Sequence, residues 1–139
     1  MTDACALCRL LRAADSDPTF IAEFDHSFAF LYYDQDAYLG RSMLVIKEHH
    51  EHFHLAPVVL QQALVPEGIK LTTAILKAFG GFRANHMSLG NQVAHLHWHV
   101  IPRYPNDLNT GHAPIHSQTE TRLPDSEYQK IAGEIRAVF

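Results

Sequence analysis

Three histidines at alternating positions are the feature of this sequence best suited to chemistry. His95, His97 and His99 are separated by single large apolar residues in the run "AHLHWHVIPRY". Residues i, i+2 and i+4 of an extended strand share one face, so the three imidazoles would lie about 6–7 Å apart along one side. Imidazole titrates close to neutral pH, and it can act as a nucleophile, a proton donor or acceptor, or a metal ligand.

Three interpretations of this run remain open from the spacing alone. The imidazoles could be polar side chains on a solvated sheet face, or they could bind a metal without any catalytic role. They could also form a catalytic group in which one imidazole is held by its neighbours. Their common register, opposite an apolar face that would anchor the strand in the core, favours the catalytic interpretation.

A C-x-x-C pair at Cys5 and Cys8 is the second candidate site. Histidine makes up 11 of the 139 residues, and four histidines fall in the short run "HHEHFH" that begins at His49. In a reducing compartment, such a pair of thiols more often binds a metal than forms a structural disulfide. Two buried thiols without a metal are the alternative. The sequence around the pair lacks the strand context of a thioredoxin-like redox motif.

Composition places the chain among ordinary globular proteins. Its length of 139 residues predicts a single domain over residues 1–139, with 47% hydrophobic and 19% charged residues. The net charge of −4 does not predict a nucleic-acid-binding surface, which needs clustered Lys and Arg. We also expect no membrane span, since no sufficiently long apolar run occurs, and no signal peptide. A cytoplasmic location is the expectation.

The N-terminal half predicts a short helix followed by three strands. The helix is expected over residues 4–14, two strands over 20–33 with a turn at Asp25–His26, a loop over 34–41 and a strand over 42–47. Apolar residues at helical spacing then predict a helix over 57–79 that ends at Gly80–Gly81. Because Pro66 and Gly68 interrupt this pattern, a kink or two consecutive helices are expected there.

The C-terminal half carries the alternating histidines on a predicted hairpin. Its strands are expected over residues 82–89 and 94–104, joined by a tight turn at Gly90–Asn91. Residues 106–123 appear irregular, and an amphipathic helix is expected over 124–139. The whole pattern predicts an α+β domain with a mostly antiparallel sheet and one main helix packed on it.

The run "HLHWHV" resembles the signature of the histidine triad (HIT) superfamily of nucleotide hydrolases and transferases, and "IPR" follows it, as is common there. The longer run "LGNQVAHLHWHVIPRY" resembles the diadenosine-tetraphosphate-hydrolase-like branch. Further similarity lies in "CALC", "AFLYYDQDAYLGRSMLVIKEH" and "KAFGGFRANHMSLGN", so it extends from residue 5 to residue 103. The resemblance implies a HIT-like α+β fold with a mostly antiparallel five-stranded sheet, one long helix and a C-terminal helix.

This resemblance implies a mechanism in which the middle histidine, His97, attacks the α-phosphorus of a nucleotide. The resulting nucleotidyl-histidine would be cleaved by water, and His99 would hydrogen-bond a phosphate oxygen or the leaving group. His95 completes the triad. The implied nucleotide-binding residues are Asn91, Gln92, Asn85 and Ser88 near the phosphate, and Asp34 at the ribose hydroxyls.

The resemblance also implies a structural zinc. Several relatives bind zinc through a C-x-x-C pair, one histidine after the "LVI" strand and the first triad histidine. The matching residues are Cys5, Cys8, His95, and either His49 or His50. We favour His49 from the spacing in the more similar relatives. Two thiolates and two imidazoles form a normal closed tetrahedral set.

The function expected from these features is hydrolysis of dinucleoside polyphosphates or related nucleotide conjugates. One alternative is a nucleotide-sensing protein with little catalysis. Others are a phosphoramidase or nucleotidyltransferase of the same superfamily, and a metal-binding protein without a nucleotide role. The intact third histidine, His99, favours hydrolysis, because transferases of the superfamily usually replace it. The resemblance further implies a homodimer.

Overall fold

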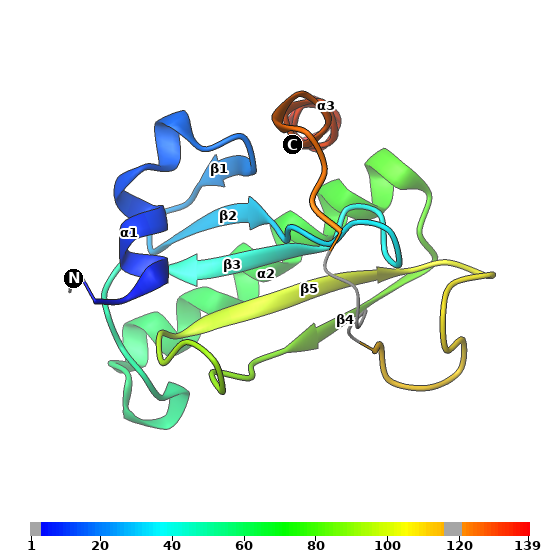
Figure 1. Ribbon diagram of the computed structural model, residues 1–139. Coiled ribbons are helices and arrows are strands. Elements are labelled where there is room, and N and C mark those ends of the chain that lie inside the picture. Colours follow the sequence, from blue (N-terminus) through cyan, green and yellow to red (C-terminus); the bar gives the residue numbers. More distant parts are fainter. Residues whose placement is uncertain (1–3, 116–120) are drawn as a thin grey trace.

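A five-stranded antiparallel sheet forms the centre of the molecule. The computed structural model describes residues 4–115 and 121–139. The strands are β1 (Phe20–Glu23), β2 (Ser27–Leu31), β3 (Ser42–Ile46), β4 (Arg83–Met87) and β5 (His97–Arg103). They lie in the order β1-β2-β3-β5-β4, and every neighbouring pair is antiparallel (Figure 1). The predicted α+β architecture is confirmed.

Two helices, α2 (Val58–Phe79) and α3 (Asp125–Arg136), cover one face of the sheet (Figure 1). The main core lies between them and the strands, where Leu44 and Val100 pack with Leu64, Leu71 and Ile135. Each of these side chains is fully buried, and burial of one such side chain contributes about 1.5–3 kcal/mol.

Helix α2 is continuous, although Pro66 lies inside it. A proline in a helix interior costs about 3 kcal/mol, because it removes one hydrogen bond and crowds the preceding turn. The buried stripe of α2, which includes Leu60, Leu64, Leu71 and Ile75, outweighs that cost. The helix ends at Gly80, whose φ of 69° is left-handed, as the sequence predicts.

The opposite face of the sheet is covered by the short helix α1 (Ala6–Arg12), which is followed by the 3₁₀ turn η1 (Ala14–Ser16). Leu7, Cys8 and Leu11 of α1 pack against Phe30 of β2 and Val45 of β3. Because α1 contains only seven residues, it covers only part of this face.

Strand β5 begins two residues later than the triad's first histidine. The sequence predicted a strand from residue 94, but His95 and Leu96 form a bend before β5. Leu96 donates its N–H to the carbonyl of His50 and accepts from the N–H of Ile46, so it pairs with the segment after β3. Strands β4 and β5 do pair, but residues 88–96 join them in place of a tight turn.

A buried ion pair holds the loop that follows β5. The Arg103 guanidinium donates to both carboxylate oxygens of Asp107 at 2.7 and 2.9 Å, and to Asn85 Oδ1 at 2.8 Å. It also donates to the carbonyl oxygens of Asn109 and His112. Arg103 therefore serves as a structural cation that closes this loop onto the sheet.

Candidate functional site

His97 and His99 lie on the sheet face that also carries α1. Their antiparallel partners on β3 are Val45 and Met43, and cross-strand partners share a face. The intervening Trp98 packs with the core under α2. Both imidazoles are nearly buried, with exposed fractions of 7% for His97 and 5% for His99. The alternation predicted from the sequence thus holds for these two histidines.

A cavity of about 400 Å³ opens directly beside these two imidazoles. Its walls come from α1, the end of β2, β3 and the segment between β4 and β5. The lining residues are His97, His99, Leu7, Tyr32, Tyr33, Met43, Leu89, Gly90, Asn91, Gln92 and Val93. The wall is largely apolar, and a few polar groups converge on the imidazoles, as in many small-molecule binding sites.

The hydrogen bond of His97 fixes which of its nitrogens is free to react. Nδ1 of His97 lies 2.6 Å from the backbone carbonyl oxygen of His95. A carbonyl oxygen only accepts, so Nδ1 carries the hydrogen. In the neutral ring, Nε2 then holds the lone pair, and His97 is ready to act as a nucleophile.

His99 is packed between a histidine and a tyrosine. Its ring centroid lies 5.1 Å from that of His97 and 5.3 Å from that of Tyr32, both at an interplanar angle of 74°. The buried Arg41 guanidinium lies 4.0 Å from the Tyr32 ring centroid. Edge-to-face packing restricts the His99 ring, so its orientation beside His97 is fixed before any ligand binds.

The predicted nucleotide-binding residues do not all reach this cavity. Asn91 and Gln92 line it. Asn85 instead accepts a hydrogen bond from Arg103, and Ser88 lines a separate hollow with His86 and Trp98. Asp34 is buried, and its Oδ1 accepts the N–H of Asp36.

Sequence reasoning missed the two tyrosines of the cavity. Tyr32 and Tyr33 follow β2 directly and precede Asp34, the residue first assigned to the sugar. The signal was the position itself, because the end of β2 lies level with the middle of β5 across β3, through the pairs Leu31–Ser42 and Ser42–Val100. The residues of this segment that line the cavity therefore lie one and two positions before Asp34.

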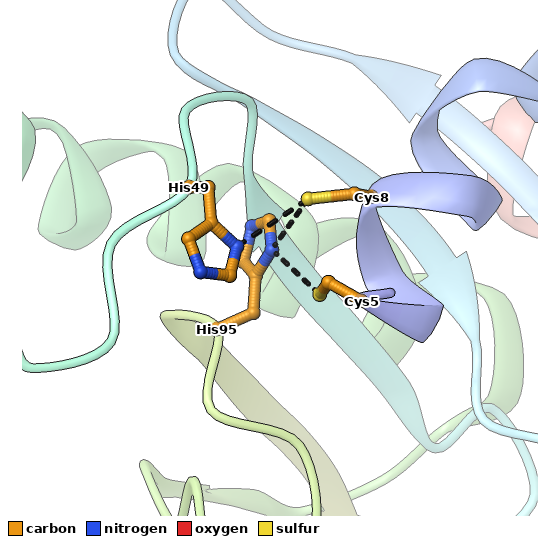
Figure 2. A group of neighbouring side chains, drawn as sticks. All are labelled: Cys5, Cys8, His49 and His95. Atoms are coloured by element: carbon orange, nitrogen blue, oxygen red, sulfur yellow. Dashed lines mark hydrogen bonds between the residues drawn. The ribbon is translucent and has the colours of Figure 1, made fainter. Parts of the chain in front are cut away.

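A second cluster joins three distant parts of the chain (Figure 2). Cys5 and Cys8 come from the start of α1, His49 from the loop after β3, and His95 from the bend before β5. Nδ1 of His95 lies 3.5 Å from each sulfur, and Nδ1 of His49 lies 3.4 Å from the sulfur of Cys8. All four donor atoms lie within 4.8 Å of one another.

These distances fit a tetrahedral metal ion. Zn–S bonds of 2.3 Å and Zn–N bonds of 2.0–2.1 Å place sulfur and nitrogen about 3.6 Å apart around one zinc. His95 donates Nε2–H to the carbonyl oxygen of Ile46 at 2.7 Å, which leaves Nδ1 as a lone pair aimed at the thiols. Burial lowers the pKa of His95, which also favours the neutral ring that a metal requires.

The structure distinguishes the two candidate histidines after β3. His49 turns its ring toward the thiols. His50 points elsewhere, with Nε2 3.3 Å from a carboxylate oxygen of Glu48. His49 is therefore the histidine of this segment whose ring lies in the cluster with the two thiols and His95.

Among the helices of residues 4–115 and 121–139, none has the length and apolar character needed to cross a bilayer.

The sequence of this chain is similar to one protein family over most of its length. The HIT domain model matches residues 13–106. An uncharacterized HIT-like protein of Methanocaldococcus jannaschii is 30% identical over 108 residues, which cover 74% of this chain and 81% of that protein.

Solved structures share the fold. A hypothetical histidine triad nucleotide-binding protein from Sulfolobus tokodaii has a TM-score of 0.77 at 19% identity, covering 96% of this chain and 91% of that one. A zinc-bound histidine triad family protein from Mycobacterium smegmatis has a TM-score of 0.73 at 18% identity, covering 97% and 92%.

Proposed function

This chain belongs to the HIT domain family, and on that premise we propose that it hydrolyses nucleotides through a covalent nucleotidyl-histidine on His97. The observation that carries this proposal is the hydrogen bond from Nδ1 of His97 to the carbonyl oxygen of His95. It leaves the Nε2 lone pair available beside a cavity large enough for a small ligand.

The proposed reaction has two displacement steps. First, Nε2 of His97 bonds to the α-phosphorus, and the bond to the leaving group breaks with its electron pair. His99 donates a hydrogen bond to the departing group or to a phosphate oxygen, where negative charge grows. Water then attacks the same phosphorus, the P–N bond breaks, and the nucleoside monophosphate is released with His97 restored.

The exposed amides of Asn91 and Gln92 are the proposed phosphate ligands. Both residues line the cavity from the segment that leads into His95 and His97. Amide N–H groups donate hydrogen bonds to phosphate oxygens without adding charge. The proposed substrates are dinucleoside polyphosphates or related phosphoanhydride and phosphoramidate conjugates of nucleotides.

Product analysis tests this proposal. The protein is mixed in turn with diadenosine tetraphosphate, ATP and adenosine 5′-phosphoramidate, and AMP release is followed by chromatography. We expect AMP from at least one substrate and its loss in His97→Ala. His86→Ala is the matched control, because His86 lies outside the cavity and should retain turnover. Tight AMP binding without turnover would instead favour a nucleotide-sensing protein.

We also propose a structural zinc held by Cys5, Cys8, His49 and His95. The four donor atoms and their spacing support it. When bound, the metal would cross-link α1 to the two loops that flank the catalytic strand. A metal-binding protein without a nucleotide role would need His97 and His99 as ligands, so metal content that is unchanged in His97→Ala would exclude it.

A homodimer is the proposed assembly. Val65 and Ile69 on α2 are 50% and 59% exposed, which is unusual for apolar residues on a long helix. Among the described strands, β4 pairs only with β5, so its outer edge can accept another strand. Sedimentation equilibrium would measure the assembly. The cytoplasmic location expected from the sequence stays a prediction.

A further inference from the structure

The candidate metal cluster, which consists of Cys5, Cys8, His49 and His95, is built on segments of chain that also form the cavity beside His97. Among the described residues, the cavity wall includes none of the four side chains of the cluster. Any effect of the cluster on a ligand must therefore pass through the segments that it brings together (Figure 2). Helix α1 and residues 91–97 are two such segments.

Helix α1 carries both thiols and one part of the cavity wall. Cys5 is the residue before its first turn, Cys8 lies in that turn, and Leu7 between them lines the cavity. Met43 and Val93 line the cavity as well, and they pack against the apolar cluster that contains Leu7 and both thiols. Side chains in a close-packed cluster do not move independently, so a displacement of the thiols would disturb this wall.

The helix itself contributes little to holding this position. It has only seven residues, and the Cys5 side chain makes no capping hydrogen bond. A helix of fewer than about 12 residues is marginal in water without tertiary contacts. Bonds from a metal to both sulfurs would therefore fix α1, and Leu7 with it, against the sheet.

The segment that leads into β5 is the second connection. Asn91, Gln92 and Val93 line the cavity, and they form neither helix nor strand. His95 follows them, and its backbone N–H donates to the carbonyl oxygen of Val93 at 2.9 Å. A metal bound to Nδ1 of His95 would thus anchor the end of a segment that has no regular structure of its own.

His95 also connects the cluster to the proposed nucleophile. Its ring donates Nε2–H to the carbonyl oxygen of Ile46 at 2.7 Å, and its Nδ1 lies 3.5 Å from each sulfur. Its backbone carbonyl oxygen lies 2.6 Å from Nδ1 of His97. A metal bond to the ring would restrict the backbone of the same residue, and with it the acceptor that fixes the His97 tautomer.

We propose that the metal cluster is a positioning element of the nucleotide cavity, so that metal and nucleotide each bind more tightly when the other is present. This inference rests on the proposed nucleotide binding and the proposed zinc, and it adds the coupling between the two sites. Coupling between two binding equilibria is reciprocal, so a single factor describes both effects. We expect that factor to be about 5–150.

The fold itself should survive metal removal, because the main core lies on the other face of the sheet, under α2 and α3. Thiols donate only weak hydrogen bonds, so removal should loosen the cluster. We expect a cooperative melting transition in the metal-free protein, with faster amide hydrogen exchange confined to α1 and residues 91–97. A metal-free protein that does not melt cooperatively would overturn the inference, since the metal would then stabilise the whole domain.

Calorimetric titration with AMP tests the coupling without requiring turnover. The protein is titrated once loaded with zinc and once after a chelator has removed the zinc and has itself been dialysed away. We expect the dissociation constant for AMP to rise by about 5–150-fold on zinc removal. Saturating AMP should increase zinc affinity by the same factor, measured by competition with a chromogenic chelator. Equal AMP affinity in the two forms overturns the inference and leaves the proposed hydrolysis and zinc intact.

His49→Ala tests the same coupling through a residue away from the cavity. The His49 side chain is 22% exposed, so its loss should leave the fold intact. At a zinc concentration that loads only the wild-type protein, we expect this variant to bind AMP as weakly as the metal-free protein, and added zinc should restore binding as it restores metal content. His50→Ala is the matched control and should bind AMP like the wild type. Weak AMP binding by zinc-reloaded His49→Ala would overturn the inference.

The same measurements separate this inference from the two proposals beneath it. Absence of AMP binding by the zinc-loaded protein overturns the proposed nucleotide site. Absence of bound zinc in metal analysis overturns the proposed zinc, and the coupling with it. Coupled binding of zinc and AMP without turnover of any substrate supports the inference and overturns only the hydrolysis.

Discussion

His95 and His97, two residues apart, are held in opposite tautomers. His95 donates Nε2–H to the carbonyl oxygen of Ile46, and His97 donates Nδ1–H to the carbonyl oxygen of His95. The first ring therefore turns its Nδ1 lone pair toward the thiols, and the second keeps its Nε2 lone pair for the cavity. Hydrogen bonds to backbone carbonyl oxygens therefore leave the lone pair on a different nitrogen in each of the two rings.

Long-range ¹H–¹⁵N correlation spectra would measure these tautomers. At about pH 8, we expect the neutral ring of His97 to carry its hydrogen on Nδ1 and the neutral ring of His95 to carry its hydrogen on Nε2. His97→Ala assigns the first set of signals. A His97 ring with its hydrogen on Nε2 would contradict the assignment of that nitrogen as the nucleophile.

Metal analysis should distinguish His49 from His50. We expect one zinc per chain in the wild-type protein and in His50→Ala, because the His50 ring lies beside Glu48. His49→Ala removes a proposed metal ligand and should weaken zinc binding by more than about 100-fold. Loss of a residue that only hydrogen-bonds to a metal ligand usually weakens binding by about 10–100-fold, so the loss of a ligand should exceed that range. The measurement is competition with a chromogenic chelator. Equal zinc affinity in both variants would contradict the ligand set.

The buried Arg103–Asp107 pair should dominate the acid sensitivity of the loop after β5. Arg103 and Asp107 expose only 6% and 1% of their side chains. Hydrogen bonding from Arg103 holds the pKa of Asp107 below its usual range. The pair's contribution is therefore complete above the unfolded pKa of about 3.9, and it is lost as the pH falls through the folded value.

Urea unfolding at neutral pH would measure this contribution. We expect Asp107→Asn to cost about 3 kcal/mol, because it leaves a buried guanidinium charge unpaired. Glu23→Gln is the control, since the Lys47–Glu23 ion pair is largely exposed and such pairs contribute less than about 1 kcal/mol. Similar losses in the two variants would show that burial does not strengthen the Arg103–Asp107 pair.

Replacing Pro66 in α2 should stabilise the protein. Its ring is exposed, and it interrupts the hydrogen bonding of an otherwise continuous helix. In a helix interior, alanine is more favourable than proline by about 3 kcal/mol. The unfolded chain gains conformational freedom when proline is replaced, and this offsets up to about 1 kcal/mol of the gain. We expect Pro66→Ala to raise the free energy of unfolding by about 2 kcal/mol in thermal and urea denaturation. A loss of stability would reveal a packing role for the ring.

The sheet and the long helices were predictable because local signals agree with tertiary packing. Alternating apolar residues placed the strands, and Gly80 marked the end of α2. The position of His97 and His99 on one face of the sheet followed from period-two spacing alone. By contrast, the sequence predicted a kink or a break at Pro66, whereas α2 is continuous there. The continuity depends on burial of one face of α2 against the sheet, which is a tertiary contact.

The details of the site required the structure because long-range hydrogen bonds decide them. His95 leaves the strand because Leu96 bonds to His50 and Ile46, which lie about fifty residues earlier in the chain. Asp34 is not among the residues that line the cavity, whereas Tyr32 and Tyr33 are. A turn-forming Asp beside two aromatic residues offers no local signal for that choice.

The sheet order also determines when the nucleotide cavity forms during folding. Strands β1, β2 and β3 form a meander with short connections, whereas β5 pairs with β3 across residues 47–96, as in the pair Ser42 and Val100. Closing that long loop is entropically costly, so we expect this pairing to come late. The parts of the cavity wall formed by Tyr32 and Met43 would then be in place before His97 and His99 pack beside them. A nucleotide would recognise only the nearly native chain, so it should slow unfolding and leave the folding rate unchanged.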